Sequence, residues 1–211
     1  MLFGRRTSSS STENGHEYVD LGLSVRWATC NIGASSPEQR GDYFAWGETR
    51  TKGRYDWDTY SMCRGSQYAL TEYNTDSSCG RVDNRTMLSS GYDVAKAKWG
   101  GRWRIPTPKE CAELVNRCRW EKWKETRGGN PAIIKVTGPN GNSILLPTTG
   151  EQCEEAEPYP MDNGNIGLYW SNSIDPARPS SGFLITFDYH YLSYQVGRSY
   201  RCFGVNVRAV L

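Results

Sequence analysis

Several features that would point to a function are scarce or missing in this sequence. The 25 Lys and Arg residues are nearly balanced by 23 Asp and Glu residues, which leaves a net charge of +2. Nucleic-acid-binding domains usually carry a dominant basic face instead. No run of apolar residues approaches the roughly 20 that a helix needs to cross a bilayer. The composition therefore argues against a nucleic-acid partner and against a membrane span.

Residues for catalysis or metal binding are equally scarce. The two histidines, His16 and His190, are too few for a histidine-rich metal site. The sequence has no Gly-rich phosphate loop, GxSxG elbow or HExxH helix. Residues 162–165 (DNGN) could offer oxygen atoms to calcium, although this composition is more typical of a turn. We therefore expect no catalytic residue, no bound metal and no cofactor.

The cysteines number seven, so they cannot all pair within one chain. No two of them have the CxxC spacing of a zinc site. A free cysteine behaves as a small apolar residue, so we expect mostly buried thiols, with Cys63 and Cys79 the pair to suspect of a disulfide under oxidising conditions. The seven are Cys30, Cys63, Cys79, Cys111, Cys118, Cys153 and Cys202.

The start of the chain lacks the pattern of an export signal. Residues 1–6 are basic, but no apolar segment follows them. Residues 7–12 form a Ser/Thr tract, which is typical of a flexible linker. We expect residues 1–16 to be a flexible tail and residues 17–211 to be a single domain.

Aromatic and turn-forming residues, in contrast, are abundant. The chain has 8 Trp and 13 Tyr residues, and such rings supply much of the core of a folded domain. Its 22 Gly and 10 Pro residues indicate many turns and short strands rather than a helical bundle. A structureless loop as long as the polar segment 49–91 is uncommon. We expect an ordered excursion held by its aromatic residues, Tyr55, Trp57, Tyr60, Tyr68 and Tyr73.

The strongest helix signal lies at residues 107–118. Thr107, Pro108 and Glu110 combine a capping box with proline at the first helical position. Apolar residues then recur at i, i+3, i+4 and i+7, which is one face of a helix: Cys111, Leu114, Val115 and Cys118. A short helix is also expected at Ser36-Pro37, where an N-cap residue precedes proline.

Short strands are predicted on both sides of this helix. Residues 133–136 and 144–146 form the clearest hairpin, because a Gly-Pro-Asn-Gly turn lies between them. Residues 17–31 indicate an opening hairpin. Further strands are expected at residues 168–170, 183–187 and 205–210, and an acidic surface loop is expected at residues 150–164.

Alternation predicts which side chains of the later strands face the core. It places Phe183, Ile185 and Phe187 inward and leaves Leu184 and Thr186 outward. The run YHYLSYQVGRSYRC that follows has neither a strand nor a helix period. We expect this run to be an irregular, exposed loop or short edge segments.

Six phrases of the sequence occur together in an order typical of one family. They are YVDLGLSVRWATCN at 18–31, GDYFAWGE at 41–48, WGGRWRIPT at 99–107, NSILLP at 142–147, LYWSNS at 168–173 and GVNVRAV at 204–210. Across residues 17–211 the chain resembles the C-type-lectin-fold domains that are paralogous surface proteins of gut bacteria and their phages. The resemblance implies an α+β domain with short, mostly antiparallel strands, one clear helix and long ordered loops. It also implies that the two termini lie close together in one small sheet.

The chain departs from two groups that share this fold. Carbohydrate-binding C-type lectins hold calcium with a Glu-Pro-Asn or Gln-Pro-Asp triplet and a Trp-Asn-Asp triplet. Here Tyr159 follows Glu157-Pro158, and Ser171-Asn172 follows Trp170, so a calcium-dependent sugar site is not expected. Formylglycine-generating enzymes need a cysteine pair near the C-terminal end, where this chain has only Cys202.

A subset of the family consists of variable proteins of diversity-generating retroelements. In these, copying errors at adenines rewrite a C-terminal coding segment, and Asn codons become many residue types but not Lys, Glu, Gln, Met or Trp. Those five types make up 36 of the 211 residues. Among residues 171–203 only one of them occurs, Gln195. The resemblance therefore implies a variable region at about residues 171–203.

A diversified binding face would combine rigid tyrosines with adaptable polar side chains, as antibody loops do. Exposed Tyr and Arg residues, Arg201 included, would give it the composition of a protein-binding surface. Trp170, Phe183, Ile185, Phe187, Val207 and Val210 would hold the core beneath it. The candidate ligand-binding residues are Asp175, Arg178, Leu184, Thr186, Tyr189, His190, Tyr191, Ser193, Tyr194, Arg198, Ser199, Tyr200 and Cys202.

Three functional hypotheses follow. The first is a non-catalytic display protein of a virion or cell surface, whose C-terminal face is diversified to bind a cell-surface protein or glycan. The second is an invariant adhesin or lectin-like surface domain of the same fold. The third and most remote is an enzyme of the formylglycine-generating type.

Overall fold

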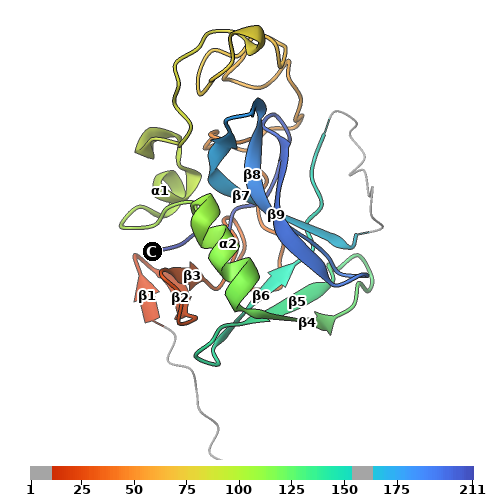
Figure 1. Ribbon diagram of the computed structural model, residues 1–211. Helices are drawn as coiled ribbons and strands as arrows, with labels where there is room; N and C mark the ends of the chain where they lie inside the picture. The colour runs from red at the N-terminus through yellow and green to blue at the C-terminus, as the bar shows by residue number, and fades with distance from the viewer. Residues whose placement is uncertain (1–10, 154–163) are drawn as a thin grey trace, which may run out of the picture.

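Three small antiparallel sheets and a few short helices make up the regular structure, an α+β architecture as predicted (Figure 1). The computed structural model describes residues 11–153 and 164–211. The sheets have the strand orders β1-β2-β3, β4-β5-β6 and β7-β8-β9. The elements are β1 (Ser11–Glu13), β2 (His16–Asp20), β3 (Arg26–Ala28), η1 (Ser77–Cys79), η2 (Ser90–Tyr92), α1 (Val94–Trp99), α2 (Pro108–Arg117), β4 (Arg119–Lys124), β5 (Ile133–Thr137), β6 (Ser143–Pro147), β7 (Ile166–Asp175), β8 (Arg178–Asp188) and β9 (Ser193–Tyr200).

The predicted helix at residues 107–118 is confirmed as α2. Thr107 Oγ1 accepts a hydrogen bond from Glu110 N, and the Glu110 carboxylate accepts one from Thr107 N at 2.8 Å. This reciprocal capping satisfies two backbone donors that the first turn would otherwise leave free. Cys111 and Leu114 are buried on the face that the apolar spacing predicts.

Two hairpins are also confirmed. β5 and β6 pair from Ile133↔Pro147 to Thr137↔Ser143, and β2 pairs with β3 as the opening hairpin. The C-terminus lies beside β3, where Leu211 N donates to Arg26 O at 3.0 Å (Figure 1). The last residues thus close onto the sheet formed by the first described strands.

The expected flexible tail at residues 1–16 is wrong for its second half. β1 pairs antiparallel with β2, and the two are joined by a turn at Asn14-Gly15. Both turn residues have positive φ, 49° and 84°, which is the conformation that an Asn-Gly hairpin turn requires. Residues 1–10 lie outside the described residues.

Two smaller expectations are also corrected, and one helix was not predicted. The chain at Ser36-Pro37 makes a turn rather than a helix. Residues 205–210 form isolated bridges to Phe44, Tyr169, Trp27 and Arg104 rather than a strand. The sequence analysis missed helix α1, although Asp93 caps it by accepting a hydrogen bond from Lys96 N at 3.1 Å.

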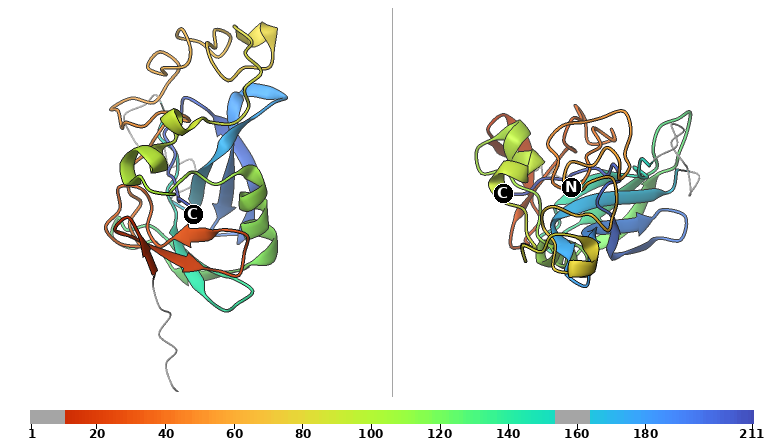
Figure 2. Two further views of the ribbon diagram at one scale, coloured as in Figure 1. Left: turned by 90° about the vertical axis from the view of Figure 1, so that its left-hand side faces the viewer. Right: turned by 90° about the horizontal axis from the view of Figure 1, so that it is seen from above.

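The polar excursion at residues 49–91 is ordered, as predicted, and lies over one end of the β7–β9 sheet (Figure 2). Tyr55, Tyr60 and Tyr73 are buried and anchor it, whereas Trp57 is half-buried. Tyr68 is 67 % exposed and anchors nothing. This excursion supplies one wall of the groove described below.

Strands β7 and β8 are buried on both faces, which overturns part of the predicted alternation. Leu184 is buried and packs with Trp170 in one core cluster, while Ile185 and Phe187 pack in a second cluster beside α2. Phe183, expected inward, is only half-buried. Because each face meets a core, alternation between polar and apolar residues cannot separate inside from outside here.

Candidate binding face

The segment expected to be irregular is a regular edge strand. β9 pairs with β8 from Ser181↔Tyr200 to Asp188↔Ser193 without a shift in register. Its side chains are exposed or half-exposed throughout. An exposed polar strand that pairs with no described strand on its outer side shows no hydrophobic period. The pattern therefore predicted an irregular, exposed loop or short edge segments.

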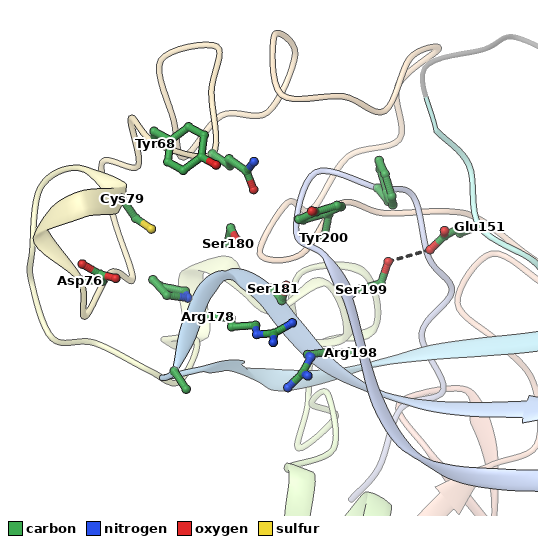
Figure 3. A pocket seen from close by; sticks show the side chains of 14 residues that line it. Tyr68, Asp76, Cys79, Glu151, Arg178, Ser180, Ser181, Arg198, Ser199 and Tyr200 are labelled. Atoms are coloured by element: carbon green, nitrogen blue, oxygen red, sulfur yellow. Dashed lines mark hydrogen bonds between the residues drawn. The ribbon is translucent and has the colours of Figure 1, made fainter.

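A groove of about 590 Å³ lies where β9 ends and β8 begins (Figure 3). In Figure 3, Tyr68 and Asp76 of the excursion stand on one side, and Tyr200 and Glu151 stand on the other. The floor between them carries the guanidinium groups of Arg178 and Arg198. The lining residues are Gln67, Tyr68, Asp76, Cys79, Glu151, Ala177, Arg178, Pro179, Ser180, Ser181, Arg198, Ser199, Tyr200 and Phe203.

The two arginines of the groove differ in whether an ion pair holds the guanidinium group in place. Arg198 Nη1 pairs with Asp175 Oδ2 at 2.8 Å, and the buried Asp175 also accepts a hydrogen bond from Ala177 N at 2.9 Å. Asp175 therefore fixes both the β7–β8 turn and the Arg198 guanidinium. Arg178 is exposed and makes no ion pair with a residue that the structure describes. None of the five N–H donors of its guanidinium bonds to a described residue, which leaves them for a ligand.

Aromatic and hydroxyl side chains complete the wall formed by β9. The Tyr200 ring meets Trp57 and Phe203 edge-on, at centroid distances of 5.8 Å and 5.5 Å, and is 42 % exposed. Ser199 Oγ donates to the Glu151 carboxylate at 2.7 Å (Figure 3). These contacts hold Tyr200 by one edge and leave the rest of its ring accessible.

Arg201 was expected on the exposed surface, and this is wrong. It is fully buried beneath the groove and donates to Tyr60 Oη at 2.9 Å, Tyr73 O at 2.9 Å and Pro179 O at 3.0 Å. Its guanidinium also lies 5.0 Å from the centroid of the Trp46 ring. A buried cation persists only when its donors are satisfied, and here backbone carbonyls do most of this.

A second, smaller hollow of about 420 Å³ lies along the middle of β9 and shares Arg198 with the groove. β9 therefore contributes to both depressions. The residues that line the hollow are Leu168, Phe183, Leu184, Thr186, Gln195, Val196, Gly197 and Arg198.

Nine of the thirteen candidate residues are exposed or half-exposed. The groove brings together Arg178, Arg198, Ser199 and Tyr200. His190 and Tyr191 lie instead at the β8–β9 hairpin tip, beside β4, where Lys122 Nζ donates to His190 O at 2.8 Å. The nine are Arg178, Thr186, His190, Tyr191, Ser193, Tyr194, Arg198, Ser199 and Tyr200.

The other four candidates are buried and cannot contact a ligand directly. Leu184 and Cys202 belong to one core cluster, and Tyr189 belongs to the other. Burial raises the pKa of Tyr189, whose N–H donates to Asn165 O at 2.8 Å. Asp175 is buried beneath Arg198. These four support the face from below.

Sequence reasoning missed the wall that the excursion contributes, formed by Gln67, Tyr68, Asp76 and Cys79. These residues form no motif. Asp76 accepts a hydrogen bond from Ser78 N at 2.8 Å and so caps η1. The sequence offered no signal for this wall, because Tyr68 was expected to anchor the excursion and its exposure is seen only in the structure.

None of the seven cysteines, all of which lie within the described residues, forms a disulfide, and Cys63 is not bonded to Cys79. Burial raises the pKa of the Cys118 thiol to about 11. Within residues 11–153 and 164–211, no three His, Cys, Asp or Glu side chains gather closely enough to hold a metal ion. The expected acidic surface loop at 150–164 and the Glu157–Tyr159 and Asp162–Asn165 motifs fall largely or wholly outside the described residues.

Comparison of the chain with models of protein families, with curated proteins and with solved structures found no match. None of the described helices combines the length and the apolar character that crossing a bilayer demands.

Proposed function

We propose that the chain has the C-type lectin fold and is a non-catalytic display protein of a virion or cell surface, whose C-terminal face is diversified to bind a macromolecular target, a cell-surface protein or glycan. The six sequence phrases support the fold. The position of the C-terminus beside β3 supports it as well, since the resemblance places both termini in one small sheet.

One observation carries the functional part of the proposal. The segment 171–203, from which four of the five residue types that adenine mutagenesis cannot create are missing, forms much of β7 and all of β8 and β9. These strands line both the groove and the hollow. The compositional bias and the accessible concave surface thus coincide. Tyr200 and Arg178 have the chemistry of protein-binding hot spots.

A specific observation favours the second hypothesis, an invariant adhesin. Leu184, Tyr189 and Cys202 are core residues within the same segment. A diversified segment must tolerate replacement, and replacing a buried large side chain costs about 2–5 kcal/mol. Their codons should therefore be spared under the first hypothesis.

The DNA around the gene distinguishes these hypotheses. The first requires a nearby near-repeat of the segment that encodes residues 168–211, differing at adenines, beside a reverse transcriptase gene. The differences should fall in codons for exposed residues, such as Tyr191 and Tyr200, and should avoid the codon for the buried Leu184. A flanking region with no such repeat would leave the invariant adhesin.

A further inference from the structure

β9 is the last strand of its sheet, and no strand of residues 11–153 or 164–211 pairs with its outer edge. Arg201 N donates to Ser180 O, which continues the β8–β9 register. In an antiparallel ladder this bonds the odd-numbered residues of β9 to β8 and turns the even-numbered ones away. Tyr194, Val196 and Arg198 consequently direct their N–H and C=O groups outward. These groups make no hydrogen bond with any described residue.

The edge also lacks the features that usually protect such strands. Natural edges are shortened, bulged, or blocked by Lys or Pro. β9 has eight residues with no Lys or Pro, and it pairs with β8 without a register shift. Its single charged side chain, Arg198, is held by Asp175. The open stretch from Tyr194 to Arg198 spans roughly 16 Å, at about 3.3 Å per residue.

The hollow beside this edge has apolar residues and space in its centre. Leu168 and Leu184 lie within it, and Gly197 contributes no side chain to cover them. A Cβ at Gly197 would lie only 2.9 Å from Thr186 Cγ2 and 3.7 Å from Leu184 Cδ1. A larger residue in β9 would therefore occupy the space that an incoming side chain could use.

We propose that β9 binds an extended segment of a partner polypeptide as an added strand, which seats an apolar side chain in the hollow beside Gly197. This inference rests on the proposed function, because it specifies how the same face holds its partner. Main-chain hydrogen bonds to Tyr194, Val196 and Arg198 supply affinity that does not depend on the partner's sequence. The hollow and the groove supply specificity.

A second copy of the chain fits this edge less well. A β9–β9 pair would place the small or polar side chains of β9 opposite the hollow, since these are the ones on that face: Ser193, Gln195 and Ser199. None of them is apolar, so the space beside Leu168 and Leu184 would stay unfilled. A partner with an apolar residue at this position matches it better.

The test uses random linear decapeptides displayed on phage and selected against the full chain. Selected peptides are synthesised with single N-methyl groups along the backbone, and each Kd is measured. An added strand loses binding at every second position, by at least about tenfold per blocked hydrogen bond. Hydrogen exchange of the Val196 and Arg198 amides slows in the complex.

Two variants of the protein provide the matched comparison. Val196→Pro removes an outward N–H, which edge positions tolerate, together with part of the packing of the Val196 side chain against the second core cluster. Val196→Ala keeps the N–H and also loses side-chain packing, so it is the reference: Val196→Pro should bind the peptides about tenfold or more weakly than Val196→Ala, with a similar Tm. The peptide N-methylation series tests the same hydrogen bonds without altering the protein.

Each of three results would overturn the inference. The first is that selection yields no peptide. The second is N-methylation effects without a two-residue period, combined with normal binding to Val196→Pro. The third is a dimer in solution that Val196→Pro dissociates, which would assign the edge to a second copy. None of these results bears on whether a near-repeat exists in the flanking DNA, so the proposed function stands or fails separately.

Discussion

At the scale of single residues, Arg201 links the base of the groove to distant parts of the chain. Its acceptors come from the excursion and from β8. Removing the guanidinium leaves these buried acceptors without a donor, which costs about 1–3 kcal/mol per group. The same side chain also fills the space against Trp46.

We therefore expect Arg201→Met to lower the free energy of unfolding by about 3–5 kcal/mol. Arg178→Met is the control, because Arg178 is exposed and has no ion-pair partner among the described residues. It should stay within about 0.5 kcal/mol of the parent. Urea unfolding at neutral pH measures both, and equal stability of the two variants would contradict the role assigned to Arg201.

The tyrosines of the binding face also include a buried residue and an exposed one. Tyr189 is 7 % exposed and Tyr191 is 78 % exposed. Tyr189→Ala should cost about 3–5 kcal/mol, as for other buried aromatic side chains, and Tyr191→Ala within about 0.5 kcal/mol. Denaturant melts of both variants check this. A stable Tyr189→Ala protein would return Tyr189 to the set of residues free to vary.

At the scale of elements, one carboxylate organises part of the excursion. Asp83 accepts hydrogen bonds from Tyr73 N at 2.9 Å, Asn74 N at 3.0 Å and Arg85 N at 3.1 Å. Partial burial acts to raise the pKa of Asp83, but the hydrogen bonds from Asn74, Tyr73 and Arg85 outweigh it and lower the pKa to about 2. The ionised form is thus favoured in the folded state.

This depressed pKa predicts an acid dependence of stability. The contribution of Asp83 is complete above the unfolded-state pKa of about 3.9 and is lost as the pH falls toward about 2. Asp83→Asn removes the titration. Urea unfolding across this range should show the parent losing more stability than Asp83→Asn, and parallel losses would contradict the assignment.

Elements with local signals were predictable, and those fixed by distant contacts were not. The Thr107 capping box and the Gly-Pro-Asn-Gly turn each specify their structure within a few residues. β9 is ordered only by pairing with β8, so its own residues gave no period. Alternation predicted that Leu184 faces outward. The core cluster that buries it contains residues more than 100 positions away in the sequence, such as Phe44, so no local pattern could reveal this burial.

At the scale of the whole molecule, the chain should fold without metal. The sequence lacks the carboxylate-amide triplets of calcium-binding lectins, as Tyr159 and Ser171 show. Excess EDTA should leave Tm unchanged. A drop of several degrees that calcium reverses would contradict this, because an ion bound only to the folded state stabilises it.

The candidate site was half predictable. The composition of residues 171–203 named Arg178, Arg198 and Tyr200 as candidates, and the structure brings these three together in one groove. The other half comes from Gln67 to Cys79 and from Glu151, whose side chains acquire a common location only through the fold. No spacing within the sequence joins these two parts.

Under the proposed function, one wall of the groove is diversified and the other wall is constant. A retroelement that rewrites residues 171–203 reaches Arg178 and Tyr200 but never Tyr68 or Asp76. Every variant in the repertoire would therefore combine a different wall from residues 171–203 with the same wall from the excursion. The repertoire is then restricted to ligands that can also contact an exposed tyrosine, in the same way that the constant framework of an immune receptor restricts the ligands that its variable loops can bind.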